Sequence, residues 1–229
     1  MKIVILTLFP EYFASALNTS ILKRAQESDL VEFDIINIRD FAEDKHQVTD
    51  DRPYGGGPGM VMKVEPIYKA LDTLDLVDKN GLKPENQRQL KTKVILTSAK
   101  GELFEQPLAQ SWSDLDQLCI ICGHYEGVDE RVANYLVDQE VRIGDYVLTG
   151  GEPAAAVMVD AVSRLVPGVL GNHQSNKNES HSTSGQLGFP QYTRPEDFLG
   201  WKVPTVLLEG NHKLIDTWRK DHRAKTEEK

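Results

Sequence analysis

The sequence predicts an α/β domain that is built on a largely parallel sheet. Two observations support this. Strand-like apolar runs occur at Ile3–Leu8, Val31–Ile38, Lys93–Thr97, Leu118–Cys122 and about Glu140–Ile143. Helical segments lie between or after them, at Ser20–Glu27, Glu65–Val77, near Phe104–Ser111, near Asp129–Val137 and at Glu152–Val166. Strands that alternate with helices are typical of a parallel sheet covered by helices.

The individual elements follow from local pattern. Ile3–Leu8 is too short for a signal peptide or a membrane span, and Pro10 ends it, so we expect a buried first strand. Glu65–Val77 repeats apolar residues at helical spacing, at Ile67, Ala70, Leu71 and Leu74. Glu152–Val166 begins beside Pro153, which suits the first turn of a helix because its missing N–H would have no partner there.

Length and composition allow a sizeable core but argue against a nucleic-acid partner. The 229 residues fit one large domain, or one domain with a small appendage, and 40% of them are hydrophobic. The net charge of -9 is unfavourable for binding RNA. Basic residues are nevertheless concentrated in Arg88–Lys100 and Lys213–Lys225, which could meet phosphates. The alternative is that both stretches are ordinary solvated surface.

Cys119 and Cys122 form a C-x-x-C spacing inside an apolar strand. Residues three apart on a strand point to opposite faces, whereas a redox pair needs a helix N-terminus and zinc needs more ligands. We therefore expect two buried thiols in a reduced, cytoplasmic protein. No metal-ligand cluster is visible in the sequence.

Three glycine-rich segments are the strongest candidates for a ligand site. Ile143–Glu152 joins a strand to an alanine-rich helix through Gly150 and Gly151. Backbone amides and a helix N-terminus meet there, which suits a polar ligand, although a tight turn is the simpler interpretation. Asp50–Met60 and Cys122–Arg131 have a similar character. None of the three fits the dinucleotide fingerprint or the P-loop.

In order and spacing, these segments resemble the bacterial tRNA (guanine-37-N1)-methyltransferases, the TrmD family of SPOUT methyltransferases. The resemblance covers nearly the whole chain and includes Leu8–Pro10, Asp160–Gly171, Pro190–Pro195 and Val206–His212. It implies a SPOUT-type parallel sheet with a deep C-terminal trefoil knot, plus a small helical C-terminal domain. The knot runs against the general rarity of knotted chains.

The implied domains are a knotted methyltransferase domain at 1–171, a mobile linker at 172–188 and a small helical tRNA-binding domain at 189–229. Residues 172–186 contain no large apolar side chain, so burial cannot stabilise one ordered conformation of this segment. Typical relatives continue past the position of Lys229 with another basic helical stretch, so the C-terminal domain would be shortened.

The resemblance implies transfer of a methyl group from S-adenosylmethionine to N1 of guanosine 37. It places the methyl donor in loops Thr97–Gly101, Gly123–Gly127 and Ile143–Gly151, largely on backbone atoms. The implied contacts are Ser98, Ala99, Gly123, Glu126, Ile143, Gly144, Asp145, Tyr146, Val147, Leu148 and Gly150. The carboxylate of Glu126 would balance the positive charge of the sulfonium. Alternatively, Glu126 is only an acidic residue that stabilises a helix N-terminus. Ala99 stands where the family usually has proline.

On the acceptor side, Arg164 matches the family's catalytic arginine, which would stabilise charge on the guanine oxygen. Its spacing from Asp160 also allows an ordinary i,i+4 ion pair. Glu179 stands where the family usually has aspartate followed by serine, and it would remove the N1 proton. The alternative is that the linker alignment is shifted and Glu179 is solvated.

The implied partners are the anticodon arm of tRNA and a second copy of the chain, because the family shares each active site across a homodimer. Asp50–Met60, with His46, would contribute to both contacts, and Arg194 could anchor the C-terminal segment. No membrane partner is expected. Two alternatives stay open: a SPOUT enzyme that acts on another RNA position, such as a ribose hydroxyl, and a non-catalytic RNA-binding relative.

Overall fold

The computed structural model describes residues 1–171, 179–182 and 186–224. The chain divides into two compact units, Met1–Gly171 and Asn172–Lys229. Each unit is described by itself. No helix among the described residues is long and apolar enough to cross a membrane.

The first unit is organised around a five-stranded sheet. Its strands are β1 (Lys2–Thr7), β2 (Glu32–Asn37), β7 (Thr92–Leu103), β8 (Gln117–Ile121) and β9 (Gln139–Arg142). They lie in the order β2-β1-β8-β7-β9, and every neighbouring pair is parallel. The predicted α/β architecture with a parallel sheet is confirmed.

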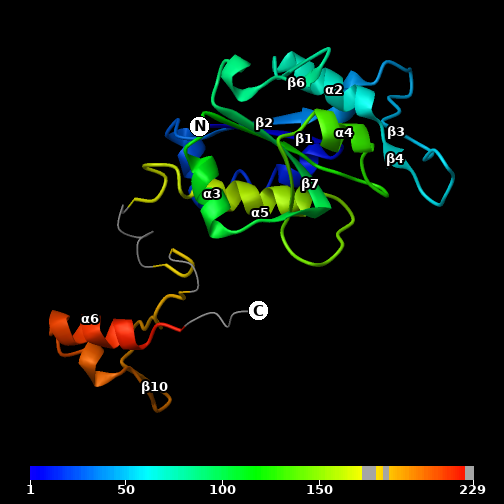
Figure 1. Cartoon of the computed structure of the whole chain (residues 1–229). Coiled ribbons are helices and arrows are strands. Elements are labelled where there is room, and N and C mark those ends of the chain that lie inside the picture. Colours follow the sequence, from blue (N-terminus) through cyan, green and yellow to red (C-terminus); the bar gives the residue numbers. More distant parts are fainter. Residues whose placement is uncertain (172–178, 183–185, 225–229) are drawn as a thin grey trace. The chain divides into compact units, whose positions relative to one another are not determined.

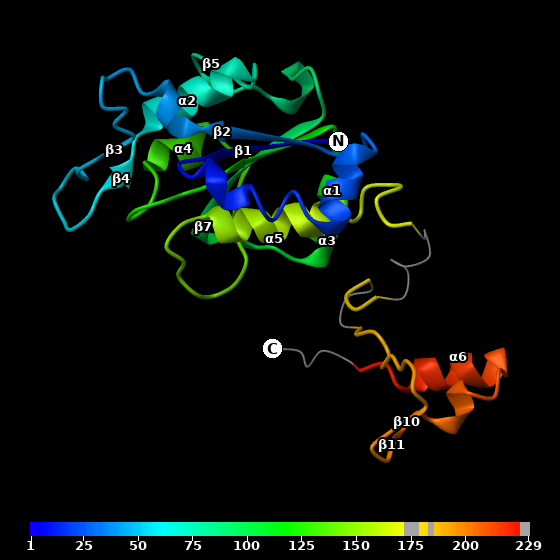
Figure 2. The same cartoon turned by 180° about the vertical axis from the view of Figure 1, so that it is seen from behind.

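Helices cover both faces of this sheet (Figures 1 and 2). One face carries α1 (Ser20–Glu27), α3 (Gln106–Ser113) and α5 (Glu152–Ser163), and the other carries α2 (Val64–Thr73) and α4 (Glu130–Tyr135). Strand side chains alternate between the two cores. In β1, Ile3 and Ile5 join the core around α5, while Val4 and Leu6 join the core around α2.

The sheet order brings the three predicted ligand loops together. Strands β8, β7 and β9 are adjacent and parallel, so their carboxyl ends lie at one edge of the sheet. Segments 123–127 and 143–151 follow β8 and β9, and segment 97–101 lies in the last part of β7. Ligands of open α/β sheets commonly bind at this edge.

Three predicted boundaries are wrong. Helix α5 ends at Ser163 instead of Val166, with Arg164 as its C-cap residue. The second helix ends at Thr73 instead of Val77, because Asp75 adopts a left-handed backbone with φ +57 and Val77 pairs with Leu82 in a short hairpin. The strand predicted to end at Thr97 continues to Leu103. It crosses an irregularity between Thr97 and Glu102 and then pairs again with β9.

Smaller elements complete the chain. In the first unit they are η1 (Pro10–Phe13), η2 (Ile38–Phe41), η3 (Glu85–Gln87) and two hairpins, β3 (Asp50–Asp51) with β4 (Val61–Met62) and β5 (Val77–Asp78) with β6 (Gly81–Leu82). The second unit contains hairpin β10 (Asp197–Phe198) with β11 (Trp201–Lys202), followed by η5 (Thr205–Leu207) and α6 (His212–Asp221).

The two cysteines are free and buried, as predicted. Cys119 belongs to the core around α2 and Cys122 to the core around α5, so they point to opposite faces. Burial raises the pKa of the Cys119 thiol to about 12 and raises the pKa of Cys122 well above its usual value. Both thiols are therefore protonated and unreactive in the folded protein.

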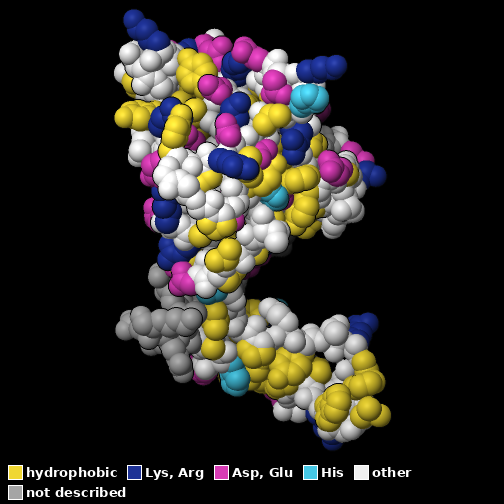
Figure 3. Space-filling model, turned by 90° about the vertical axis from the view of Figure 1, so that its right-hand side faces the viewer, with side chains coloured by type: hydrophobic (Ala, Val, Ile, Leu, Met, Phe, Trp, Pro, Cys, Tyr) yellow, Lys and Arg dark blue, Asp and Glu magenta, His cyan; other side chains and the backbone are white. Residues whose placement is uncertain are grey.

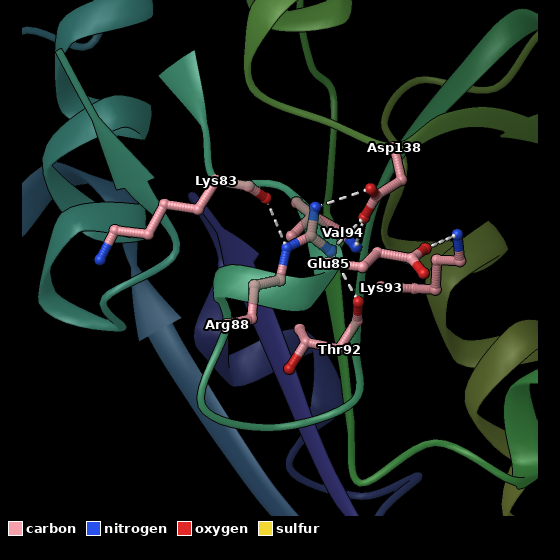
Figure 4. A network of polar contacts seen from close by, with 7 residues as sticks. All are labelled: Lys83, Glu85, Arg88, Thr92, Lys93, Val94 and Asp138. Atoms are coloured by element: carbon pink, nitrogen blue, oxygen red, sulfur yellow. Dashed lines mark hydrogen bonds and ion pairs between the residues drawn. The ribbon is translucent and has the colours of Figure 1, made fainter. Parts of the chain in front are cut away.

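A buried ion pair between Arg88 and Asp138 holds the segment before β7 against the sheet (Figure 4). The guanidinium of Arg88 donates to both carboxylate oxygens of Asp138, each at 2.8 Å, and to the carbonyl oxygens of Lys83 and Thr92. Asp138 also accepts from the backbone N–H of Val94 at 2.7 Å. Because the Arg88 side chain is 2% exposed, either partner left alone would be a desolvated charge.

We expect Arg88→Met to lower the free energy of unfolding by about 3 kcal/mol, because Asp138 would remain buried without its cation. Urea denaturation measures the loss. The matched control is Lys23→Met, which breaks only an exposed pair with Glu27 at 3.7 Å and should cost under about 0.5 kcal/mol. Equal losses in the two variants would contradict this role for Arg88.

Native protein at pH 8 should not react with a thiol reagent, and two thiols should react once urea unfolds it. Since the folded pKa values are raised, the cysteines contribute stability below the unfolded thiol pKa of roughly 8.5. That contribution is lost as pH rises above this value. Rapid labelling of either cysteine in folded protein would show that the burial is wrong.

Candidate ligand site at the glycine loops

A cavity of about 460 Å³ lies at the carboxyl ends of β7, β8 and β9. Its walls are formed by Leu96–Lys100, by Gly123–Val128 and by Ile143–Gly151 without Asp145. Residues of α4 and β9 add to this lining. The volume falls in the range of small-molecule sites. Three segments far apart in sequence thus form one concave surface.

Ten of the eleven residues predicted to contact a methyl donor line this cavity: Ser98, Ala99, Gly123, Glu126, Ile143, Gly144, Tyr146, Val147, Leu148 and Gly150. Asp145 does not line it. Its carboxylate is exposed and accepts a hydrogen bond from Arg142 Nε at 2.8 Å. Arg142 also donates to the carbonyl of Gly101, so Asp145 helps hold two loops together.

The floor of the cavity depends on a close backbone crossing. The N–H of Gly151 donates to the carbonyl of Gly123 at 2.7 Å, and Gly150 forms a bridge with His124. A Cβ at Gly151 would lie 1.9 Å from Thr97 Oγ1 and 2.9 Å from Gly123 N. Only glycine allows the chain to lie this close to Thr97 of β7 and to the Gly123 backbone that follows β8.

The glycine-rich hairpin β3–β4 packs beside the cavity. Met62 N donates to Gly127 O at 2.9 Å, and Glu126 N donates to Met60 O at 3.0 Å. A Cβ at Gly59 would lie 2.3 Å from Glu126 Cγ. The hairpin therefore fixes the backbone and restricts the side chain of Glu126 on the cavity wall.

The rim carries charged residues that the sequence did not single out. Lys100 contacts Glu130 at 2.6 Å and Glu140 at 3.7 Å, and all three line the cavity. The hydrogen bond that the ammonium group of Lys100 donates to Glu130 raises the pKa of Lys100. Glu130 begins α4 at the end of the Cys122–Arg131 segment, and Glu140 belongs to β9. Their signal would have been their position directly beside the ends of the strands.

The predicted acceptor-side residues lie in different units. Arg164 is half-buried and caps the C-terminus of α5 in the first unit. Glu179 is half-buried in the second unit, where its carbonyl accepts from the hydroxyl of Ser182 at 2.8 Å. Most of the predicted linker, residues 172–178 and 183–185, lies outside the described residues.

The basic stretch Arg88–Lys100 is largely neutralised. Arg88, Lys93 and Lys100 pair with Asp138, Glu85 and Glu130, and Lys91 donates to a backbone carbonyl. On the face in Figure 3, positive and negative side chains are interspersed over much of the surface. Because Arg88 is buried and the three lysines have partners, this stretch fits a phosphate-binding patch poorly.

The fold and the site together define a class of protein. It is an α/β protein with a glycine-lined ligand cavity at the carboxyl ends of parallel strands. The family model described as tRNA (Guanine-1)-methyltransferase TrmD matches residues 1–229. The chain belongs to this family, as the motifs predicted.

Its relatives include proteins named tRNA (guanine-N(1)-)-methyltransferase from three organisms. The protein from Carboxydothermus hydrogenoformans is 54% identical over 96% of this chain and 81% of its own length. That from Halalkalibacterium halodurans is 50% identical over 98% and 87%, and that from Staphylococcus aureus is 50% identical over 97% and 86%.

Proposed function

We propose that this protein transfers a methyl group from S-adenosylmethionine to N1 of guanosine 37 in tRNA. Family membership supports the reaction, and relatives about half identical in sequence carry the corresponding name. The observation that carries the proposal is the cavity itself, because residues matched to the family's methyl-donor loops converge on it from three separate segments.

The residues present fit this methyl donor. Side chains at Gly123, Gly150 and Gly151 would fill or distort the walls, so backbone lies open to the ligand. Apolar lining from Ile143, Val147 and Leu148 suits a flat purine ring, and the carboxylate of Glu126 suits a cation. When bound, the donor supplies an electrophilic methyl group on a sulfonium.

The protein's part in the reaction is to orient the reactants and to move one proton. Arg164 would hold the guanine oxygen and stabilise the charge that develops there. Glu179 would accept the proton from N1 as N1 forms its bond to the methyl carbon. The methyl–sulfur bond breaks, its electron pair stays on sulfur, and the products are N1-methylguanine and a neutral thioether.

The proposal includes three further features of the family: a trefoil knot, a tRNA-binding C-terminal domain and a homodimer. The close packing of Gly150–Gly151 against Thr97 of β7 and against Gly123–His124 after β8 supports a knotted path. Exposed Tyr54 and Val147, on the glycine-rich hairpin and a cavity loop, support a partner at the cavity. In the second unit, α6 places Arg219 over the ring of Phe189 and leaves neighbouring basic residues exposed.

We expect Gly151→Ala to weaken S-adenosylmethionine binding at least tenfold, because its methyl group must displace Thr97 or the Gly123 backbone. Isothermal titration calorimetry measures the affinity. Gly171→Ala is the matched control, since a Cβ there meets no atom within 4 Å. Unchanged affinity in Gly151→Ala would exclude the crossing from the methyl-donor site.

The function is tested with an unmodified tRNA transcript that carries guanosine 36 and 37, beside a copy with adenosine 37. Methyl transfer to N1 of guanosine 37 alone is the expected result. In single-turnover assays, Arg164→Ala and Glu179→Gln should each slow transfer about 100-fold or more. The exposed Arg24→Ala and Glu209→Gln are matched controls that should keep full rate.

Transfer to a ribose, or to another base, would instead favour a SPOUT enzyme of different position specificity. Methyl-donor binding without transfer to any RNA would favour the non-catalytic alternative. A full single-turnover rate in Glu179→Gln would remove Glu179 from the role of base while leaving the reaction itself intact.

A further inference from the structure

Behind the cavity lies a hydrogen-bonded series that the proposed reaction does not use. The N–H of Phe9 donates to Thr7 Oγ1 at 3.0 Å, and the Thr7 hydroxyl donates to Glu152 Oε1 at 2.8 Å. Glu152 is only 4% exposed. The series therefore runs from Phe9 through the Thr7 hydroxyl to Glu152, whose Oε1 acts as the acceptor.

The second oxygen of Glu152 faces a histidine. Glu152 Oε2 lies 4.0 Å from His124 Nδ1, and in the described part of the chain Nδ1 is buried without a hydrogen-bond partner. An ionised carboxylate can only accept, so the ring nitrogen that faces it is the one favoured to carry hydrogen. A small inward movement of the ring would turn this contact into a charge-assisted hydrogen bond.

The pair touches the cavity wall directly. His124 lines the cavity, and its ring packs between Phe9 at 4.9 Å and Tyr125 at 5.0 Å between centroids. A Cβ at Gly150 would lie 2.4 Å from Glu152 Oε2 and 2.6 Å from His124 Nδ1. The carboxylate and the imidazole thus lie against the chain segment that closes the site.

We propose that Glu152 is a positioning residue that fixes the Nδ1–H tautomer of His124. The other ring nitrogen, Nε2, then accepts a hydrogen bond from the ammonium group at the amino-acid end of the methyl donor. Glu126, two residues along the same loop, also lines this cavity, so a second acceptor would be available to a cationic group. This inference rests on the proposed function, because it needs the methyl donor in this cavity.

Glu152 also lies at the N-terminus of α5, where an acid stabilises a helix by its charge alone. A test must separate the two roles. Glu152→Gln keeps the size of the side chain and an acceptor for Thr7, but its amide NH₂ would face Nδ1. The amide would therefore reverse the tautomer, leaving Nε2 as a donor that cannot bind an ammonium group.

The experiment compares two ligands that differ in the amino-acid end. S-adenosylhomocysteine carries the ammonium group, whereas 5′-methylthioadenosine lacks it. Glu152→Gln should weaken S-adenosylhomocysteine about tenfold, the loss of one hydrogen bond to a charged group, and leave 5′-methylthioadenosine unchanged. Nitrogen-15 shifts of His124 at pH 8.5 should change from the Nδ1–H to the Nε2–H pattern. Glu27→Gln, on the exposed face of α1, is the matched control and should alter neither readout.

His124→Phe provides a second variant that keeps a ring in the same packing, and it should show the same selective loss. An equal loss for both ligands in both variants would overturn the inference and leave Glu152 with a structural role only. An unchanged tautomer in Glu152→Gln would overturn it as well. Wild-type protein that binds neither ligand would instead refute the proposed function itself.

Discussion

The site depends on one backbone contact, the hydrogen bond from Gly151 N to Gly123 O. This bond holds the chain that links β9 to α5 against the segment that follows β8. No side chain fits at the crossing, because Thr97 Oγ1 and the Gly123 backbone occupy the space. The crossing closes the cavity on one side and, on the other, positions the buried carboxylate of Glu152 at the start of α5.

The surrounding structure supports this contact from several directions. The apolar face of α5 packs against α1, α3 and β1, so the helix cannot move without opening the core. The β3–β4 hairpin fixes the loop after β8 through backbone bonds to Gly127 and Glu126. The Arg88–Asp138 pair holds the start of β9 against β7. More than half of the residues that line the cavity lie in loops, as is usual for binding sites on a rigid scaffold.

Much of the fold was readable from the sequence, because buried parallel strands and amphipathic helices leave strong periodic signals. α1 was predicted with its observed bounds. The errors arose where tertiary contacts override local pattern. Leu74 continues the apolar stripe of α2, yet the chain turns at Asp75 to form a hairpin. β7 extends past the predicted end because β9 offers a second stretch of pairing beyond the irregularity at Thr97.

The glycine loops could be identified from the sequence because clustered glycines are a local signal of close backbone packing. Glu130 and Glu140 were missed because an acid in a helix or strand has no local signature of function. The link from Thr7 through Glu152 to His124 was beyond sequence reasoning, since it joins residues 145 positions apart. The roles of Arg164 and Glu179 remain predictions from the family, because the two residues belong to separate units.

We expect the methyl donor to bind at the glycine crossing of the first unit. Hydrogen exchange with and without S-adenosylmethionine tests it most directly, because amide protection maps the bound surface. If the donor binds there, exchange should become slower mainly in 97–101, 123–127 and 143–151. Protection confined instead to the second unit's own cavity of about 840 Å³, between Phe189 and Arg219, would contradict it.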